Sequence, residues 1–571
     1  MLEKYISAAA GREKAELVLK NAAYLDVFCG VIRKGDIAVV GGKIVGIGSY
    51  EGEKELDVSH LTVLPGYIDG HVHIESSQLS PEEFASLIVP RGTTTIIADP
   101  HEITNVCGKA GCEYIAKASE NVPLDVKIQL PSCVPATPFE TSGAVLNGKD
   151  TEAILKEGYI YGLGEFMNYP GVINCDADVI KKLEAAHAHG KIIDGHAPAV
   201  YGETLNAYLC GGISTDHECV YKEEIDEKIS KGMYVHIRHG SSTQNLGNAK
   251  CMTNANMRRF ILCTDDRHAA DLKEKGHLDD ALRRLVADGV DPIAAVTCAT
   301  LNCAECYGLK YKGAIAPFWA ADLVVVDNLK NFNAKYVFKD GKLFAKDGKP
   351  LFDTSKRYLP ENVLNTVHVK TLKPEDFTLT LKGKKAKAMT IEPGGVVTGC
   401  EIVEVQSVNG DVDVKGTDIL KMAVVERHKM TGNIGKGLFK GYGFKGGATG
   451  ITIAHDSHNI ILLGDDNAAL ATAANKLKEI GGGMVLVNSA TGEVDSVTLD
   501  IGGLMSSRDA EGLQRDSKAL IEKAYSMGVK RELEAFMSLA FLSLAVIPKL
   551  KLLDTGLFDV EKFSFTDINA E

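Results

Sequence analysis

Two histidines separated by a single residue, His71 and His73, are the side chains whose type and spacing most directly predict chemistry. Alternate side chains of an extended strand point to the same side, so both imidazoles can reach one metal ion. Residues 64–77 around them have an apolar strand pattern, and Asp69-Gly70 places the pair where a strand gives way to a loop. Because such loops often carry function, we interpret the pair as metal ligands. The alternative is a pair of ordinary half-buried histidines.

The elements that would position this pair are short strands alternating with segments of helical length. Eight strand-like segments follow one another: Leu61–Pro65 leading to His73, Thr93–Asp99, Val126–Leu130, Ile160–Glu165, Lys191–Asp194, Gly212–Asp216, Met233–Ile237 and Arg259–Thr264. Alternation of this kind is typical of a parallel βα array. Eight repeats predict an α/β fold built on a (β/α)8 TIM-like barrel.

Potential metal ligands lie at the carboxyl ends of five of these strands, the face on which barrel enzymes carry their active sites. They are His71, His73, Glu165, His196, His217 and Asp265. Four imidazoles and two carboxylates suit two divalent cations a few ångströms apart, with one carboxylate able to bridge them. A ligand set without thiolates favours Zn, Fe or Mn over a structural cysteine-rich zinc site.

Two further regions flank the predicted barrel, which we expect over residues 63–306. Short strands bounded by Gly, Asn or Asp fill residues 1–62, and similar strands recur around an Asp-Gly turn in residues 307–360. Together these segments predict a small β-sandwich domain that the barrel interrupts. Residues 361–571 predict a C-terminal α+β domain, with a helix over residues 467–480.

The composition excludes several classes of partner. Of 571 residues, 45% are hydrophobic, so a core can form, and the net charge of −13 argues against a polyanionic partner such as nucleic acid. No apolar run approaches the roughly 20 residues of a membrane-spanning helix, and charges interrupt the N-terminal residues where a signal peptide would be apolar. Thirteen cysteines without framework spacing fit reduced thiols. We therefore expect a cytoplasmic enzyme with neither a nucleic-acid nor a membrane partner.

Several longer strings carry a resemblance to a known family. Pro65-Gly-Tyr-Ile-Asp-Gly-His-Val-His73 resembles the first-strand signature of the amidohydrolase superfamily. Within that superfamily, the following strings are similar to the adenine deaminase family: His71-Val-His-Ile-Glu-Ser-Ser77, Gly92-Thr-Thr-Thr-Ile-Ile-Ala-Asp-Pro-His-Glu102, Gly162-Leu-Gly-Glu-Phe-Met-Asn-Tyr-Pro-Gly171, Asp194-Gly-His-Ala-Pro198, Thr215-Asp-His-Glu-Cys219 and Cys263-Thr-Asp-Asp-Arg-His268. Glu165 stands where many superfamily members have a carboxylated lysine, which is a feature of the adenine deaminase branch.

The resemblance implies a ligand set and a reaction. One metal ion would be held by His71, His73 and Asp265, and a second by His196 and His217, with Glu165 as the bridge. The cofactors would be two divalent cations, Mn or Fe(II) before Zn, which generate hydroxide near neutral pH. Asp265 would take the proton of the hydroxide that attacks C6 of adenine and pass it to the leaving amino group, with Glu165 as the second catalytic residue. The products would be hypoxanthine and ammonia, in purine salvage, and we expect a homo-oligomer, a dimer.

The substrate must also be held at its N1 edge, where charge develops when the ring loses its aromaticity. The candidates are Glu75, His101, Glu102, Glu218, Arg238 and Asp266. Some of these residues have an alternative role. Glu102 and Glu218 can orient neighbouring histidines, and Arg238 can pair with one of these two carboxylates. Asp266 can be a turn residue. We expect His236 to be an ordinary structural histidine.

Two strings of the C-terminal region, Glu426–Gly435 and His455–Asn459, are also similar to the adenine deaminase family. They can cover the barrel mouth or place polar groups such as those of His455 and His458 near it. We favour the alternative, a structural polar cluster or a subunit contact.

Other functions predict different features. Deaminases with one zinc ion use His-x-Glu with Pro-Cys-x-x-Cys, and although His73-Ile-Glu75 and Cys303-Ala-Glu-Cys306 occur, Asn302 replaces the proline, so we reject that reading. A cyclic amide hydrolase of the dihydropyrimidinase or hydantoinase type would form products without ammonia. A non-catalytic assembly protein on an amidohydrolase-like scaffold would be expected to lose ligands, whereas all six are present.

Overall fold

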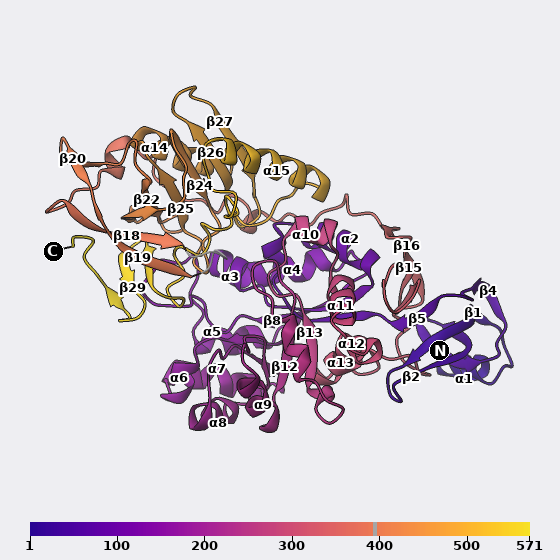
Figure 1. Cartoon of the computed structure of the whole chain (residues 1–571). Coiled ribbons are helices and arrows are strands. Elements are labelled where there is room, and N and C mark those ends of the chain that lie inside the picture. The colour runs from indigo at the N-terminus through magenta and orange to yellow at the C-terminus, as the bar shows by residue number, and fades with distance from the viewer. Residues whose placement is uncertain (392–396, 571) are drawn as a thin grey trace.

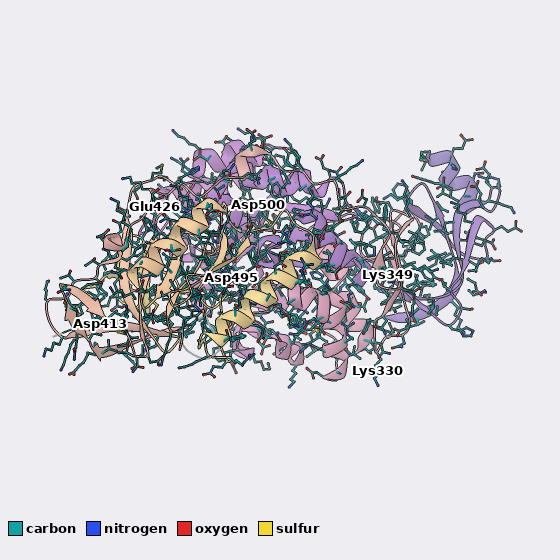
Figure 2. The ribbon with its side chains drawn as sticks, turned by 90° about the horizontal axis from the view of Figure 1, so that it is seen from above. Lys330, Lys349, Asp413, Glu426, Asp495 and Asp500 are labelled. Carbon is teal, nitrogen blue, oxygen red and sulfur yellow. The ribbon has the colours of Figure 1, made fainter. Side chains whose placement is uncertain are left out.

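The computed structural model describes residues 1–391 and 397–570. Three regions follow one another across Figure 1: a small sheet with the N-terminus at the right, a central region of strands and helices, and a second large sheet at the upper left. In the view from above in Figure 2, Asp413 and Glu426 lie in the C-terminal region, and Lys349 lies towards the small sheet on the opposite side.

The small sheet joins two distant segments of the chain. Residues 15–350 are all described, and nine of their strands pair in the order β17-β16-β15-β14-β5-β1-β2-β3, with β4 beside β1. These strands are β1 (Ala15–Asp26), β2 (Val31–Val40), β3 (Lys43–Gly48), β4 (Gly52–Asp57), β5 (Thr62–Pro65), β14 (Leu323–Val326), β15 (Ala334–Lys339), β16 (Lys342–Lys346) and β17 (Lys349–Pro350). The antiparallel pair β5 and β14 connects the segments, with Leu64 opposite Val324. Strands from the two segments therefore share one sheet.

The central region consists of parallel strands. A five-stranded half-barrel contains β6 (Tyr67–Val72), β7 (Thr93–Ala98), β8 (Asp125–Leu130), β9 (Ile160–Phe166) and β10 (Ile192–Gly195). A three-stranded sheet contains β11 (Thr215–Asp216), β12 (Tyr234–Arg238) and β13 (Phe260–Cys263). Isolated parallel bridges, Ile193 with Ile213 and Val72 with Asp265, link these sheets on both sides.

The start of the parallel array differs from the prediction. The sequence predicts one strand running from Leu61–Pro65 towards His73, but β5 belongs to the small sheet and β6 opens the parallel sheet. The chain changes sheet at Gly66, where a Cβ atom would lie 2.3 Å from Thr94 Oγ1. Only glycine allows this close approach of the backbone to the next strand.

Helices separate the parallel strands, as a βα array requires. They are α2 (Pro81–Ile88), α3 (His101–Cys107), α4 (Lys109–Ser119), α5 (Gly148–Leu155), α6 (Tyr169–Ile173), α7 (Ala177–Ala188), α8 (Gly202–Cys210), α9 (Lys222–Ser230), α10 (Ala269–Glu274), α11 (Leu278–Ala287), α12 (Pro292–Cys298) and α13 (Leu301–Cys306). Local sequence explains several starts: Ser80 caps α2 ahead of Pro81 at its first position, and Asp176 caps α7.

The C-terminal region contains an eight-stranded sheet, counted over the described residues. Its order is β19-β18-β23-β22-β25-β24-β26-β27, with β18 (Lys385–Ile391), β19 (Thr398–Glu404), β22 (Ile419–Val425), β23 (Ile434–Lys440), β24 (Gly447–Ile451), β25 (Ile460–Gly464), β26 (Gly483–Asn488) and β27 (Val494–Thr498). The predicted helix is α14 (Asn467–Glu479), capped by Asp466, and α15 (Ala510–Ser526) follows. Two short sheets, β20 (Gln406–Val408) with β21 (Asp411–Asp413) and β28 (Leu550–Leu553) with β29 (Gly556–Asp559) and β30 (Ser564–Phe565), complete it.

The C-terminal region packs against the helix and the loop that follow the first and third parallel strands, β6 and β8. The carboxylate of Glu83 in α2 accepts hydrogen bonds from the Ala510 backbone and from Arg357, each at 2.8 Å. Thr141 donates from its backbone and its hydroxyl to Asp554, at 3.0 and 2.7 Å. These contacts hold the C-terminal region, through the start of α15 and the turn after β28, against segments that follow the carboxyl ends of the strands.

Two further expectations can be compared with the structure. All thirteen cysteines have free thiols, as predicted. In the described part of the chain, none of the helices has the length and apolar character needed to cross a membrane.

Candidate metal centre and active site

The six predicted ligands come together in one cluster at the carboxyl ends of the parallel strands. His71 is in β6 and His73 follows it, Glu165 is in β9, and His196, His217 and Asp265 follow β10, β11 and β13. All are buried except His196, which is half-buried. The structure thus brings the six side chains of the predicted set together.

One group of potential ligand atoms contains His71, His73 and Asp265. The Nε2 atoms of the two histidines lie 3.1 Å apart. Asp265 Oδ1 lies 3.0 Å from His73 Nε2 and 3.7 Å from His71 Nε2. Ligands about 2 Å from a shared tetrahedral ion are separated by distances of this order, so the three atoms can hold a divalent cation.

Glu165 faces this group with one carboxylate oxygen and a second group with the other. Its Oε1 lies 3.4 Å from His73 Nε2 and 3.8 Å from His71 Nε2. Its Oε2 lies 2.8 Å from His196 Nδ1 and 3.3 Å from His217 Nε2. This is the arrangement of a carboxylate that can bridge two cations.

Asp99, at the end of β7, orients both groups. Its backbone carbonyl lies 2.8 Å from His73 Nδ1, so this nitrogen donates to the carbonyl and Nε2 is the ring atom that faces Asp265. The Asp99 side chain accepts a hydrogen bond from the backbone N–H of Glu165 at 2.8 Å. A neighbouring strand therefore fixes one imidazole and the proposed bridging carboxylate at once.

Asp265 has an unusual backbone conformation, with φ at 56°. Non-glycine residues in this left-handed region are uncommon and concentrate at functional sites. Its backbone N–H donates to the His71 carbonyl at 2.9 Å, which places the carboxylate beside the two histidines. Arg238 Nη1 donates to Asp265 Oδ2 at 2.7 Å, so the other oxygen, Oδ1, is left facing His73.

The pKa values of the buried carboxylates and histidines in the cluster favour the binding of cations. Burial opposes ionisation of Glu165, but hydrogen bonds from His196 and His217 outweigh it and place its pKa well below the ordinary value. Burial also opposes ionisation of Asp265, and Arg238 is the main group that lowers its pKa. Burial disfavours charge on His196, yet the hydrogen bond to Glu165 raises its pKa to about 9.

These shifts describe ionised carboxylates that are neutralised by protons on the surrounding histidines. Divalent cations can replace those protons without leaving buried negative charge uncompensated. The donor set, nitrogen and oxygen without thiolate, is suited to a catalytic metal site. The residues present therefore fit a metal centre.

Comparison with known proteins agrees with this geometry. A family model described as "Amidohydrolase family" matches residues 62–344, and one described as "Adenine deaminase C-terminal domain" matches residues 395–564. "Adenine deaminase 2" of Desulfotalea psychrophila is 47% identical over 573 aligned positions, covering 100% of this chain and 99% of the relative. "Adenine deaminase" of Clostridium acetobutylicum is 44% identical, covering 99% of both chains.

The chain belongs to the adenine deaminase family. The parallel half-barrel and the additional β-sheets are accordingly those of an amidohydrolase-fold α/β enzyme that acts on C–N bonds. Among solved structures, an enamidase is similar with a TM-score of 0.46 and 19% identity, over 58% of this chain and 96% of that chain. A β-aspartyl dipeptidase from Fervidobacterium islandicum AW-1 also has a TM-score of 0.46, with 18% identity, over 58% of this chain and 98% of that chain.

Two of the predicted substrate-binding residues of this family member form a pair beside the metal ligands. Arg238 Nη1 donates to Glu218 Oε1, and its Nη2 lies 3.2 Å from Glu218 Oε2. Glu218 Oε1 is also 3.5 Å from His217 Nε2. Arg238 thus connects Glu218 to Asp265. This pairing with a carboxylate is the alternative role predicted from the sequence for Arg238 beside substrate binding.

Glu102 is held by histidines of the C-terminal region. His455 Nδ1 lies 2.5 Å from Glu102 Oε1, and His458 Nε2 contacts Oε2. His455 and His458 therefore form a buried polar cluster with Glu102 of α3, the helix next to the metal site. Glu426 accepts hydrogen bonds from its own loop, from the backbones of Lys429 and Thr431 at 2.6 and 2.8 Å.

The remaining candidates also surround the cluster. His101 Nδ1 lies 3.5 Å from Glu165 Oε1, and Asp266 accepts a hydrogen bond from the Ser76 hydroxyl. Glu75 Oε1 accepts from the Ile103 backbone at 3.1 Å, whereas its buried Oε2 has no hydrogen-bond partner among the described residues. Burial raises the pKa of Glu75 to about 7.

Two residues were expected to be structural. His236 is fully buried beside His71 and His217, and burial lowers its pKa to about 3, so it is neutral. Cys303 is buried in α13 within an apolar cluster, which agrees with the rejection of a cysteine-bound zinc site.

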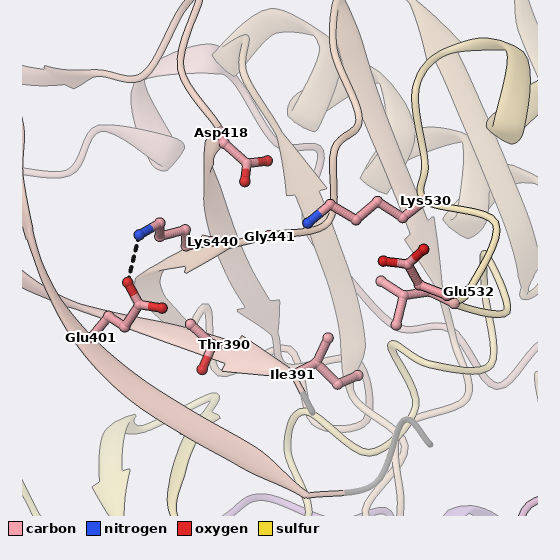
Figure 3. A pocket seen from close by; sticks show the side chains of 9 residues that line it. Thr390, Ile391, Glu401, Asp418, Lys440, Gly441, Lys530 and Glu532 are labelled. Atoms are coloured by element: carbon pink, nitrogen blue, oxygen red, sulfur yellow. Dashed lines mark hydrogen bonds and ion pairs between the residues drawn. The ribbon is translucent and has the colours of Figure 1, made fainter. Parts of the chain in front are cut away.

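Two cavities differ in their relation to the metal cluster. A small cavity of about 10 Å³ is lined by residues of the central and C-terminal regions: Glu75, Ser76, Glu102, Ile453, His455, His458, Leu504 and Met537. A pocket of about 290 Å³ lies in the C-terminal region. Figure 3 shows the ion pair of Glu401 with Lys440 on one side of this pocket, and Lys530 on the other side. The larger pocket contains none of the predicted site residues, so the small cavity is the one adjoining the chemistry.

Proposed function

We propose that this enzyme hydrolyses free adenine to hypoxanthine and ammonia in purine salvage, using two divalent cations. The observation that carries the proposal is the orientation of Glu165, whose Oε1 faces His71 and His73 and whose Oε2 faces His196 and His217. Membership of the adenine deaminase family supports the substrate, and the names of the relatives support the reaction.

The cations would be held by His71, His73, Glu165, His196, His217 and Asp265. Mn or Fe(II) are the first choices and Zn is a further one, because the set combines imidazoles with carboxylates and lacks thiolates. When bound, the cations would lower the pKa of a water molecule and so supply hydroxide near neutral pH.

Asp265 is the proposed proton carrier. As a new C–O bond forms at C6 of adenine, its carboxylate accepts the proton of the attacking hydroxide and then gives that proton to the amino group, which leaves as ammonia. Arg238, bonded to Oδ2 at 2.7 Å, keeps the other oxygen turned towards His73. Glu165, the second catalytic residue, holds the two groups of histidines at a fixed separation.

A further proposal concerns the arrangement of the parallel strands and the division into domains. We infer that the five-stranded and three-stranded parallel sheets are parts of one eight-stranded (β/α)8 barrel, which the two isolated bridges between them support. The division into a split β-sandwich domain, a barrel over residues 63–306 and a C-terminal domain remains our proposal, as do a dimeric state and a cytoplasmic location, which the free thiols favour.

One assay tests the function. Protein reconstituted with Mn or Fe(II) should convert adenine to hypoxanthine with one equivalent of ammonia, and a chelator should abolish the conversion. The alternative classes predict other results: a cyclic amide hydrolase would open a dihydropyrimidine or hydantoin ring instead. Turnover of those compounds without turnover of adenine would contradict the proposal.

A further inference from the structure

Asp456 is a buried carboxylate of the C-terminal region that adjoins the proposed active site. It is 4% exposed, and its Oδ2 is enclosed without a hydrogen-bond partner among the described residues. A buried carboxylate oxygen without a hydrogen-bond partner costs free energy of desolvation, so this oxygen indicates a position where a ligand can donate a hydrogen bond. Building on the proposed function, we infer that Asp456 recognises the imidazole-ring N–H of adenine and thereby selects the free base over its N9-substituted forms.

His101 connects Asp456 to the reaction centre. The Nδ1 atom of His101 lies 3.5 Å from Glu165 Oε1, and its Nε2 lies 4.0 Å from Asp456 Oδ1. The two carboxylates thus face opposite edges of one imidazole ring. On this proposal, the six-membered ring of adenine, with C6, would lie towards Glu165 and the five-membered ring towards Asp456.

The loop that carries Asp456 is anchored on both sides. His455 and His458, its neighbours in sequence, both contact the carboxylate of Glu102 in α3. The buried guanidinium of Arg427 donates to the His458 carbonyl. Asp456 is therefore fixed relative to His101, which begins the same helix as Glu102, and such preorganisation favours selective binding.

The charges around Asp456 suit an N–H donor. Burial raises the pKa of Asp456 to about 6, and the carboxylates of Glu102 and Glu165 add to the increase, against the opposing effects of His101 and His455. Glu140 is a further acidic neighbour. A donor placed at the free oxygen relieves this repulsion and forms a charge-assisted hydrogen bond.

Free adenine has an N–H on its five-membered ring, whereas a nucleoside or an N9-alkylated adenine has carbon at N9. A site built to bond that N–H rejects the substituted compound because a buried oxygen is then left without a partner. Asp456 is thus assigned as a specificity-determining residue that contacts the substrate, supplied by the C-terminal region.

The test compares Asp456→Ala and Asp456→Asn with the wild-type enzyme, using Asp413→Ala, an exposed residue of the same region, as the control. Each protein is loaded with Mn, and its metal content and thermal unfolding are measured. Adenine and 9-methyladenine are compared by kcat/KM, or by inhibition constant where 9-methyladenine does not turn over. Asp456→Ala should lose at least 100-fold in kcat/KM for adenine, mainly through KM, and less than threefold in its interaction with 9-methyladenine, while metal content stays constant.

Asp456→Asn keeps an acceptor and should show an intermediate loss, which preserves the test if the alanine variant does not fold. Equal losses for both compounds, or no loss for adenine, would overturn the role of Asp456. Loss of a metal equivalent in both variants would also overturn it, since Asp456 would then be a ligand together with His101 and Glu102. A wild-type enzyme inactive on adenine would instead contradict the proposed function itself.

Discussion

Glu165 Oε2 lies 2.8 Å from His196 Nδ1, while Oε1 of the same carboxylate lies 3.4 Å from His73 Nε2. One side chain therefore connects the ligand groups of opposite sides of the parallel array. A glutamate fixed by the backbone contact to Asp99 needs no modification to perform this role, unlike a carboxylated lysine.

Replacement of Glu165 by Gln should remove metal and activity together. The amide keeps the shape of the carboxylate but loses its charge and one acceptor oxygen, so it cannot bridge two cations. We expect the loss of at least one metal equivalent, measured by elemental analysis, and a decrease in kcat of at least 100-fold. Glu152→Gln, on an exposed surface of the same region, is the matched control. A Glu165→Gln protein with two metal ions and full activity would show that the bridge is elsewhere.

Arg238→Lys should impair turnover more than metal binding. Arg238 donates to Asp265 and to both oxygens of Glu218, and the single ammonium of lysine cannot reproduce this fork. We expect a decrease in kcat of at least tenfold with both metal ions retained, because Asp265 is no longer held in position.

The interaction between Arg238 and Glu218 can be tested by a double-mutant cycle that combines Arg238→Lys with Glu218→Gln, with kcat/KM as the measured quantity. Since both changes act on one network, their effects should be far from additive. Arg258→Lys, which alters an exposed ion pair with Glu305, serves as the control. Additive effects would show that Arg238 and Glu218 act separately.

The metal ligands could be predicted from the sequence because chemistry restricts their residue types and the strand ends restrict their positions. His71 and Glu165 are examples, since each stands near the end of a recognisable apolar strand. The distribution of the two Glu165 oxygens between the groups depends on side-chain geometry, which a sequence pattern does not contain.

Other features depend on contacts between distant residues. The change of sheet at Gly66 results from its approach to Thr94 on the neighbouring strand, and no local pattern marks it. The contact of His458 with Glu102 joins residues 356 positions apart. In the C-terminal sheet, β23 has the sequence Ile-Gly-Lys-Gly-Leu-Phe-Lys, whose two glycines weaken the local strand signal.

Glu102 should hold the C-terminal region in place. Its carboxylate is buried and contacts His455, His458 and, at 3.4 Å, His101, so removal of the charge leaves several donors unsatisfied. We expect Glu102→Ala to destabilise the protein by about 1–3 kcal/mol and to make the 453–458 segment exchange its amide hydrogens faster. Hydrogen exchange followed by mass spectrometry measures the second effect. Unchanged exchange in this segment would show that other contacts, such as those of Arg427, suffice.

Asp125 should make the stability of the protein depend on acid pH. This residue begins β8 and lies 2.5 Å from Lys312 and 3.4 Å from Lys339 of β15, so it links the parallel sheet to the small sheet. Burial opposes its ionisation, but the two lysines, Lys312 first, lower its pKa to about 2 from an ordinary 3.8. A depressed carboxyl pKa contributes stability above the ordinary value and loses it as the pH falls towards the lowered one. The contribution is about 1–2 kcal/mol, discounted for partial exposure.

The variant Asp125→Asn should therefore unfold at a lower temperature than the wild type at pH 5 to 7, with a difference that shrinks as the pH falls below about 4. Calorimetry at several pH values measures it, with Asp288→Asn, an exposed residue after α11, as the control. The direction in which this difference in unfolding temperature changes with pH tests the lowered pKa of Asp125. A carboxyl group whose pKa were raised on folding would give a difference that grows on acidification. A pH-independent difference would mean that Asp125 contributes through packing and not through its charge.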